Sequence, residues 1–546
     1  MPQFTKDHVF ILPHTEEYRK FYNIGIEDIL LTLNKPEVHA GLSSDRYTVE
    51  KSFGPYRVYV YYYLTLPLQG DKDEAYAIVD FIGYTGNATI LPFYRSVKGI
   101  CRKSDMLFFS YRETLMYVFI LLVARSHIHE RKVFTMLQTL STLEDVQKMY
   151  DWFEEMRNTQ PVWLDESSGC WHVFRYDDVL NVISNYTLFS SERRRQRFQA
   201  RAAANAEDGQ PRGGRSIIAM DPPQHRQYRN LVSHAFTPRA IDRLRGRVAA
   251  ITQELLDEAR SAGKMDFATE IAYPLPTIVI AEMLGVPTSD RPLFKRWADG
   301  LLRRQLSDAE FFRPEEEQRK DPEFQRLMHT FEEMSDYFRQ MLEERKRVPR
   351  QDMMSDLLEA SVDGEHLSME DAISFSTLLL LAGHVTTTNL LSQAIRCFDE
   401  HPEVLSQLRK QPELMPTAIE EVLRYASPVW RLVRTNKEEV TIAGVSIPKD
   451  EMIFTWLASA NRDPRQFTEP ERFDITRTPN RHVAFGHGIH FCIGAPLSRM
   501  EAAVALPMII KQLPNLRVIH DDSPELFEGR ILFGFKRLPI AFDAAA

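Results

Sequence analysis

The chain has 546 residues with a formal charge of −9, and 44% of its residues are hydrophobic and 26% charged. This length exceeds one ordinary core, so at least two domains are expected, and the charge gives no general attraction to nucleic acid. The four cysteines, Cys101, Cys170, Cys397 and Cys492, form no CxxC pair, which argues against a zinc knuckle or a disulfide scaffold and indicates a reducing, cytoplasmic compartment.

Residues 1–85 are predicted to form a small α+β domain of unknown function. The stretch YNIGIEDILLTLNKPE (22–37) favours a helix, and aromatic and β-branched runs favour strands at Tyr56–Leu64 and Ala75–Tyr84. A helix followed by a hairpin is similar to small RelE-like domains and related domains of unknown function. This similarity rests on pattern rather than on catalytic residues, and a structural or interaction role is the plain alternative.

Residues 86–141 show no clear period and are predicted to be a linker with some packed structure. Their apolar run LMYVFILLVA (115–124) has ten residues, whereas a bilayer-spanning helix needs about 20. A buried helix or strand is therefore expected there, an interfacial anchor is the alternative, and no membrane span is predicted. Met136 is an alternative start for a chain that would still carry every motif described next.

From residue 142 onward the pattern is mainly helical with short strands. Thr142 is a candidate cap of the capping-box type for TLEDVQKMYDWFEEMRN. Residues 170–186 indicate a strand leading into a helix, and residues 240–263 indicate amphipathic helix that ends at a glycine. Short strands are expected again at 439–456 and 530–542.

The first motif is MDPPQHRQYRNLVSHAFTPR (220–239), in which His225 and Arg229 are four residues apart. This spacing places both side chains on one helical face. Such a face can hold anionic groups through charge-assisted hydrogen bonds. Scattered surface side chains are the alternative interpretation.

The second motif is LLLLAGHVTTTNLLSQAI (378–395), an apolar helix interrupted by Ala382-Gly383 and three threonines. Thr386 follows Ala382 by four residues, so its hydroxyl can reach back to the Ala382 carbonyl. His384 is expected to point about 100° away from Val385. Ordinary back-bonding in a kinked helix is the alternative for Thr386.

The third motif is EEVLRY, in which Glu421 and Arg424 are three residues apart and share a helical face. By itself this spacing also fits a generic surface salt bridge. Its interpretation therefore depends on the motif that follows.

The fourth motif is FGHGIHFCIG, Phe485 to Gly494, with one cysteine between two glycines. A thiolate is a strong electron donor and a good iron ligand. Gly488 and Gly494 permit turns and a close approach that a Cβ would obstruct, backbone N–H groups can point at the sulfur, and Phe485 would shield it from water. A buried structural cysteine in a loop is the alternative for Cys492.

The four motifs together resemble the cytochrome P450 family, in its soluble bacterial class, over residues 142–546. The resemblance implies a mainly α fold with small β-sheets and a haem b cofactor (iron protoporphyrin IX) whose iron is bound by Cys492. It implies that Glu421 and Arg424 form a buried ion network with a downstream arginine, expected to be Arg472. Four side chains would hold the haem propionates: His225, Arg229, Arg434 and His490.

The resemblance also implies the chemistry, a monooxygenase that inserts one oxygen atom from O2 into a small organic substrate. Thr386 would bind the activated oxygen and organise proton delivery, with Ala382 and Gly383 opening a groove for dioxygen. This chain has Val385 where the family usually has an acid. Electrons are expected from a ferredoxin and its reductase, because no flavin or iron–sulfur motif is visible in the sequence. A peroxide-using peroxygenase and a haem-based binding or sensor protein stay open as alternatives.

Overall fold

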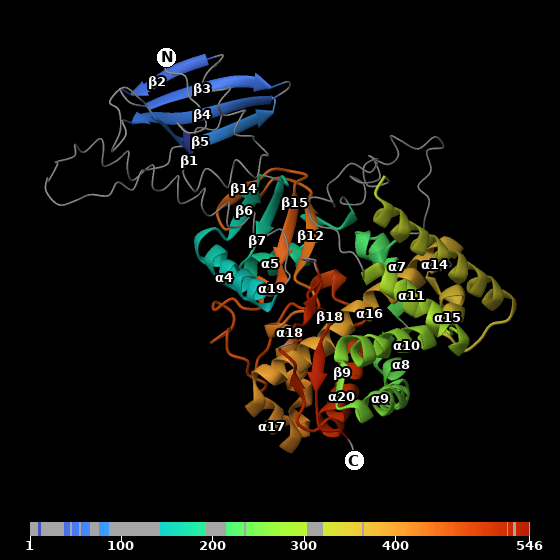
Figure 1. The fold of residues 1–546 in the computed structure, drawn as a ribbon. Helices are drawn as coiled ribbons and strands as arrows, with labels where there is room; N and C mark the ends of the chain where they lie inside the picture. Colours follow the sequence, from blue (N-terminus) through green and yellow to red (C-terminus); the bar gives the residue numbers. More distant parts are fainter. Residues whose placement is uncertain are drawn as a thin grey trace. The chain divides into compact units, whose positions relative to one another are not determined.

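The computed structural model describes strand residues between 9 and 86 and most of residues 142–544, with gaps at 167, 193–214, 234–235, 303–319, 363–364, 521 and 528–530. The chain divides into two compact units, Met1–His127 and Ile128–Ala546. The colours of Figure 1 follow the chain through both units.

The first unit contains a five-stranded sheet in the order β1-β5-β4-β3-β2. Strands β2 to β5 pair antiparallel with their successive neighbours, and β1 pairs parallel with β5. The strands are β1 (Val9–Ile11), β2 (Val38–Ser43), β3 (Arg46–Phe53), β4 (Tyr56–Thr65) and β5 (Tyr76–Gly86).

Strands β4 and β5 correspond to the two strands predicted from the aromatic and β-branched runs. The other N-terminal predictions lie outside the described residues: the helix at 22–37, the linker beyond residue 86 and its apolar run at 115–124.

The second unit is mainly helical, as predicted. Its described α-helices are α4 (Leu143–Thr159), α5 (Tyr176–Ser184), α7 (Gln224–Ser233), α8 (Pro238–Asp242), α9 (Arg245–Ala259), α10 (Pro274–Met283), α11 (Arg291–Leu302), α14 (Pro322–Arg347), α15 (Met353–Glu359), α16 (Met369–Glu400), α17 (Pro402–Lys410), α18 (Met415–Tyr425), α19 (Leu457–Ala460) and α20 (Ala495–Gln512). Short 3-10 or π turns are η2 (Ile217–Ala219), η4 (Arg260–Ala262), η5 (Ala268–Ala272), η6 (Thr288–Asp290), η7 (Pro412–Leu414) and η8 (Gly488–His490).

Small sheets accompany the helices. The larger one has the order β6-β7-β15-β12-β8, formed by β6 (Val162–Asp165), β7 (Cys170–Val173), β15 (Met452–Trp456), β12 (Arg431–Asn436) and β8 (Phe189–Ser190). The remaining strands are β9 (Lys264–Asp266), β10 (Ser361–Val362), β11 (Glu365–His366), β13 (Val440–Ile442), β14 (Val445–Ile447), β16 (Arg517–Val518), β17 (Glu525–Leu526), β18 (Phe535–Arg537) and β19 (Pro539–Ala541).

Local sequence explains where α4 begins. The Thr142 side chain accepts from the Asp145 backbone N–H at 3.1 Å, and the Asp145 carboxylate accepts from the Thr142 N–H at 3.1 Å. This is a capping box with aspartate as the reciprocating residue, and it satisfies two N–H groups that the helix leaves unpaired.

Helix α16 is the centre of the second unit. Its 32 residues span about 48 Å at 1.5 Å per residue, and α10, α14, α18 and α20 all pack against it (Figure 1). Its length and apolar composition would suffice to cross a bilayer, but 72% of the most apolar window is buried inside the protein. The burial identifies α16 as a core helix.

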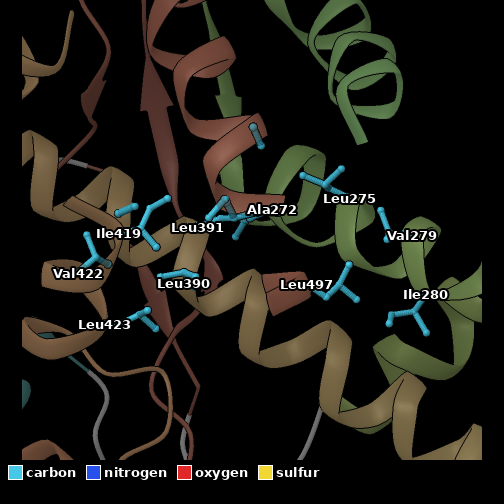
Figure 2. Packing of buried hydrophobic residues seen from close by; sticks show 14 of the residues in the cluster. Ala272, Leu275, Val279, Ile280, Leu390, Leu391, Ile419, Val422, Leu423 and Leu497 are labelled. Atoms are coloured by element: carbon cyan, nitrogen blue, oxygen red, sulfur yellow. The ribbon is translucent and has the colours of Figure 1, made fainter. Parts of the chain in front are cut away.

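Apolar side chains fix the neighbours of α16. In Figure 2, Leu390 and Leu391 of α16 lie near Ile419 and Val422 of α18, while Leu497 of α20 lies near the other end of the same cluster. Each of these side chains is at most 4% exposed. Burying a leucine or isoleucine side chain contributes about 1.5–3 kcal/mol, so this cluster holds α16, α18 and α20 in one rigid body.

Candidate active site

A tight loop directly before α20, at the end of the irregular segment that follows α19, presents Cys492. The Cys492 N–H donates to the Phe485 carbonyl at 2.9 Å, which closes the loop over the single turn η8. Gly488 has a φ of +70°, and a Cβ there would lie 3.0 Å from the Ser184 Cα. Glycine is therefore required at Gly488 both for the backbone conformation and for contact with α5.

Gly494 does not have the turn role expected of it. Its φ is −81°, and a Cβ there would meet the Cys492 sulfur at 3.9 Å, an ordinary contact. The second positive-φ glycine of the loop is Gly486, at +69°. Gly494 instead contributes its backbone N–H, because it stands where the chain enters α20.

The Cys492 sulfur lies among groups that favour its thiolate form. Burial raises the pKa of the thiol, while hydrogen bonds from the Gly494 and Ala495 backbone N–H groups and the charges of Arg229 and Arg499 act to lower it. Donors aimed at a sulfur stabilise negative charge there and reduce its electron donation to a bound metal. These donors and charges would stabilise the Cys492 thiolate when a metal cation binds to it.

A cluster of basic side chains stands beside the loop. His225 of α7 and His490 of η8 have ring centroids 4.3 Å apart, and the Nε2 atom of each is buried without a hydrogen-bond partner. Burial, Arg229 and Arg434 lower the pKa of His225 to about 4, with Asp221 acting in the opposite direction. Burial, Arg434, His225 and Arg229 lower the pKa of His490 to about 3.

The four expected basic residues are thus brought together: the two histidine rings are in contact, and the charges of Arg229 and Arg434 act on both of them. Arg229 also holds the loop itself, since it donates to the Ile489 carbonyl at 3.0 Å and to the Phe491 carbonyl at 2.7 Å. Two orphaned imidazole nitrogens beside two guanidinium groups form a site that an anionic group would complete. The carboxylates of haem have this chemistry, so the residues present fit the cofactor.

Glu421 and Arg424 form an ion pair buried behind the loop. Both side chains are 0% exposed, with nitrogen–oxygen distances of 2.8 Å for both bonds of the bidentate pair. The Arg424 guanidinium also donates to the carbonyls of Asn461, Pro470 and Arg472. The pair therefore fixes three separate points of the chain that precedes the Cys492 loop.

The third arginine of this network is Arg477, and the prediction of Arg472 was wrong. Arg477 lies 3.3 Å from the Glu421 carboxylate, with its side chain 10% exposed. The Arg472 side chain is 65% exposed and pairs with the exposed Glu469 at 3.3 Å. Arg472 contributes its carbonyl, rather than its guanidinium, to Arg424, in an irregular segment where Glu469 has a φ of +46°.

A second ion cluster was not predicted from the sequence. Glu420 accepts from Arg499 at 2.7 and 2.8 Å and lies 3.1 Å from the His482 ring. Burial raises the pKa of Glu420, but hydrogen bonds from Arg499 and His482 outweigh it and bring the pKa to about 2. Arg499 also stacks 4.5 Å over the Phe485 ring. The Arg499 guanidinium that covers Phe485 is therefore itself paired with Glu420 of α18. The sequence signal for this ion cluster was the doubled glutamate of EEVLRY.

The other wall of the site is α16. The Thr386 hydroxyl donates to the Ala382 carbonyl at 2.7 Å, as its spacing predicted, and both residues border open space. The helix hydrogen bonds nevertheless continue through Ala382-Gly383, so α16 is not interrupted. A Cβ on Gly383 would lie 2.8 Å from the Ile280 Cδ1 atom, so this glycine admits α10 against α16 (Figure 2 labels Ile280).

His384 and Val385 face away from that space. His384 is 1% exposed, its ring meets Tyr273 edge to face at 4.5 Å, and burial lowers its pKa to about 3. Val385 is 6% exposed and offers no exchangeable proton. Neither side chain can therefore act as an acid toward Thr386.

Comparison with known proteins agrees with this geometry. The family model described as Cytochrome P450 matches residues 165–542. The chain belongs to the cytochrome P450 family. It is 40% identical over 396 residues to a putative cytochrome P450, YjiB, of Bacillus subtilis, covering 72% of this chain and 93% of the relative.

Two further relatives support the assignment to this family of haem monooxygenases. The erythromycin C-12 hydroxylase of Saccharopolyspora erythraea is 38% identical over 409 residues, 74% of this chain and 97% of that protein. The crystal structure of CYP109E1 from Bacillus megaterium, in complex with testosterone, has a TM-score of 0.63 and 39% identity, covering 72% of this chain and 99% of that one. The chain is thus a cytochrome P450 monooxygenase that acts on a small molecule with O2, and its cofactor is haem.

Proposed function

We propose that Cys492 is the thiolate ligand of a haem b iron and that the protein hydroxylates or epoxidises a small organic substrate. Bound through a thiolate, haem activates O2 reductively and inserts one oxygen atom into the substrate. The observation that carries the proposal is the sulfur of Cys492, which accepts hydrogen bonds from two backbone N–H groups in a loop closed onto Phe485. The Glu421–Arg424–Arg477 network keeps that loop in place.

His225, Arg229, Arg434 and His490 are proposed to hold the haem propionates. A carboxylate placed between His225 and His490 would give each orphaned Nε2 atom a partner and favour the protonated rings. Arg229 is also proposed to stabilise the Cys492 thiolate. Its hydrogen bonds to the Ile489 and Phe491 carbonyls place its positive charge near the Cys492 sulfur.

Thr386 is proposed to orient the oxygen to be transferred and to pass protons toward it. Its hydroxyl currently donates to the Ala382 carbonyl, and rotation about χ1 would redirect that donor into the open space that both residues border. Ala382 leaves room there because its side chain is a single methyl group. Gly383 acts indirectly, since its contact with Ile280 sets the distance between α10 and α16.

Electrons are proposed to come from a ferredoxin and a ferredoxin reductase in the cytoplasm. The basic segment RNLVSHAFTPRAIDRLRGR (229–247) includes α8, the start of α9 and Arg229, which contacts the Cys492 loop. A basic surface near the ligand loop would attract an acidic electron carrier. The substrate is proposed to be a bulky ring compound, because relatives are named for erythromycin and bind testosterone.

Use of peroxide in place of O2 and reductase is a second candidate, and Val385 is the feature that favours it. Peroxide already carries the two electrons and protons that O2 must acquire, so an enzyme fed with peroxide needs less proton delivery. Such an enzyme would form product with peroxide alone and without any redox partner.

The test is the carbon monoxide difference spectrum of the reduced protein, in wild type and in Cys492→Ala. The wild type is expected to show the band characteristic of thiolate-bound haem, and Cys492→Ala is expected to lack it, while Cys170→Ala and Cys397→Ala keep it. Titration with testosterone and erythromycin, read as a haem spin-state shift, then tests the substrate class. A Cys492→Ala variant that keeps the band would remove the ligand assignment.

A further inference from the structure

Asp221 is a buried carboxylate that stands directly before α7. It is 6% exposed. Its carboxylate accepts hydrogen bonds from the Ser190 hydroxyl at 2.6 Å and from the Ser191 backbone N–H at 3.0 Å, and it lies 3.0 Å from the Lys437 ammonium. Burial raises the pKa of Asp221, but these three donors outweigh it and bring the pKa below its usual value. The side chain is therefore an anion fixed by three separate contacts.

The donors to this carboxylate belong to two paired strands. Ser190 is the last residue of β8, and Lys437 directly follows β12, the strand that carries Arg434. The two strands pair antiparallel. The Lys437 ammonium is itself held, because it also donates to the Tyr186 carbonyl at 2.8 Å. Asp221 thus binds β8 and β12 at one edge of the larger sheet, three residues from Arg434.

The backbone of Asp221 begins the next helix. Its carbonyl accepts from the His225 N–H at 3.0 Å. Pro222 and Pro223 stand between the two residues, and each proline ring fixes its own φ. A movement of Asp221 is therefore passed on to α7, where Arg229 follows His225 by one turn. One residue connects the paired strands to the helix that carries two of the basic side chains.

Asp221 also lies close to the basic cluster itself, here called the propionate clamp after the role proposed for its residues. The negative charge of Asp221 raises the pKa of both His225 and His490, whereas the charges of Arg229 and Arg434 lower both. Among the described residues, Asp221 is the only carboxylate whose charge acts on both rings. The carboxylate is thus placed behind the propionate clamp and not on a remote surface.

We propose that Asp221 is the positioning residue of the propionate clamp and fixes the distance between its α7 side chains and Arg434 on β12. The proposal rests on the proposed function, which assigns the propionate clamp to the haem propionates. Side chains that bind a ligand keep their geometry only where neighbouring groups hold them in place. Asp221 stays on its donors from Ser190, Ser191 and Lys437, and does not touch the propionates, which carry the same charge.

The test measures the release of haem from the holoenzyme to excess apomyoglobin, which captures free haem. Each protein is loaded with haem and, in parallel, with haem dimethyl ester, which has no free carboxylates. Asp221→Asn keeps the side-chain volume but cannot pair with Lys437, and Lys437→Met removes the cation while keeping the Asp221 charge. Both variants should release haem about two- to tenfold faster than wild type, the factor of one net hydrogen bond. Both should release the ester at the wild-type rate.

Asp371→Asn is the matched control. Asp371 is 3% exposed, accepts from the Arg215 backbone N–H at 2.8 Å and pairs with the Arg215 guanidinium at 2.7 Å. Its carbonyl accepts from the Tyr228 hydroxyl of α7 at 2.8 Å. It is therefore a second buried carboxylate beside the same helix, with a similar set of donors. Asp371→Asn should lower the thermal unfolding temperature but leave the ratio of haem to ester release at its wild-type value.

Several results would overturn the proposal. Equal acceleration of haem and ester release in Asp221→Asn would mean a general loosening of the fold. Slower haem release in Asp221→Asn would mean that its charge repels the propionates. The same change of ratio in Asp371→Asn would show that Asp221 has no special position. If Asp221→Asn fails to fold, Lys437→Met carries the same comparison, and a wild-type ratio in that variant would refute the proposal.

The same measurements separate this proposal from the proposed function. Wild-type protein should release the ester faster than haem, because the ester offers the propionate clamp no charge. Equal rates in wild type would remove the propionate assignment together with the role of Asp221. The carbon monoxide band of the reduced samples reports separately on Cys492, so its presence shows that the ligand assignment stands in either case.

Discussion

Replacement of Arg477 by alanine should weaken the fold around the Cys492 loop, whereas Arg472→Ala should not. The Arg477 guanidinium donates to the Glu421 carboxylate at 3.3 Å and to the carbonyls of Thr468, Glu469 and Arg472 at 2.7, 3.1 and 3.2 Å. Arg472 has one exposed ion pair at 3.3 Å. The two arginines are five residues apart, so they form a matched pair of substitutions.

The size of the effect follows from burial. Hydrogen bonds to charged groups contribute about 1.5–3 kcal/mol each. The three carbonyl bonds of Arg477 are exposed on one side, so we expect a total loss of about 2–4 kcal/mol. An exposed ion pair contributes about 0–1 kcal/mol. With an unfolding entropy of about 2.1 cal/mol/K per residue, a domain of roughly 400 residues shifts by about 1 °C per kcal/mol. Arg477→Ala should therefore unfold about 2–5 °C earlier than wild type.

The assay is thermal unfolding of the purified holoenzyme, followed by circular dichroism and by release of haem. Arg477→Ala should lose haem at the temperature of its lowered transition, and Arg472→Ala should coincide with wild type within about 1 °C. Equal shifts in both variants, or a larger shift in Arg472→Ala, would refute the assignment of Arg477 as the third member of the network.

Three further outcomes are expected. Thr386→Ala should keep normal haem content but convert less NADPH into product and more into peroxide, because the hydroxyl that passes protons is gone; coupling equal to wild type would assign this role to another group. A chain beginning at Met136 should fold and bind haem, since every motif lies in the unit Ile128–Ala546; loss of haem binding in that chain alone would make residues 1–135 part of the functional core. Burial raises the pKa of Glu501 well above the usual 4.5. The protonated form is thus favoured by folding, so wild-type stability is full below pH 4.5 and declines as pH rises. Glu501→Gln should remove this decline, and urea unfolding at pH 5 and pH 8 should show its advantage growing with pH; a constant difference would mean that Glu501 is ionised in the folded protein.

Spacing in the sequence predicted the parts of the site that depend on local geometry. The pairs His225/Arg229, Ala382/Thr386 and Glu421/Arg424 are each three or four residues apart on one helix, and helix periodicity alone decides that such side chains share a face. The fold class followed from the same motifs through their resemblance to a known family.

Spacing did not predict what depends on a turn or on a distant neighbour. Arg472 and Arg477 lie in the same irregular segment, and the path of the backbone there, which has no helical or strand period, places Arg477 against Glu421. The turn role expected of Gly494 belongs to Gly486, which has a φ of +69° and lies near the His490 carbonyl and Leu432. The sign of φ in a loop depends on such neighbours, which are not visible in the local sequence. The Glu420–Arg499 pair joins two helices that are distant in sequence, so only the packing of α18 on α20 brings the charges together.

The contrast between Cys492 and Cys397 shows why one of two unpaired thiols can bind a metal. Burial raises the pKa of Cys397 to about 12, even though the Arg396 charge opposes the rise. This thiol lies inside α16 at 0% exposure, among apolar neighbours. Cys492 instead borders the same open site as the basic cluster, and two backbone N–H groups already point at its sulfur. The thiolate is the form that binds iron. The Cys397 sulfur accepts one long contact from Arg396 Nη2 at 3.8 Å in a fully buried place, whereas the Cys492 sulfur accepts from two backbone N–H groups. Gly486 and Gly488 contribute to this arrangement, because both have a positive φ in the loop that presents Cys492.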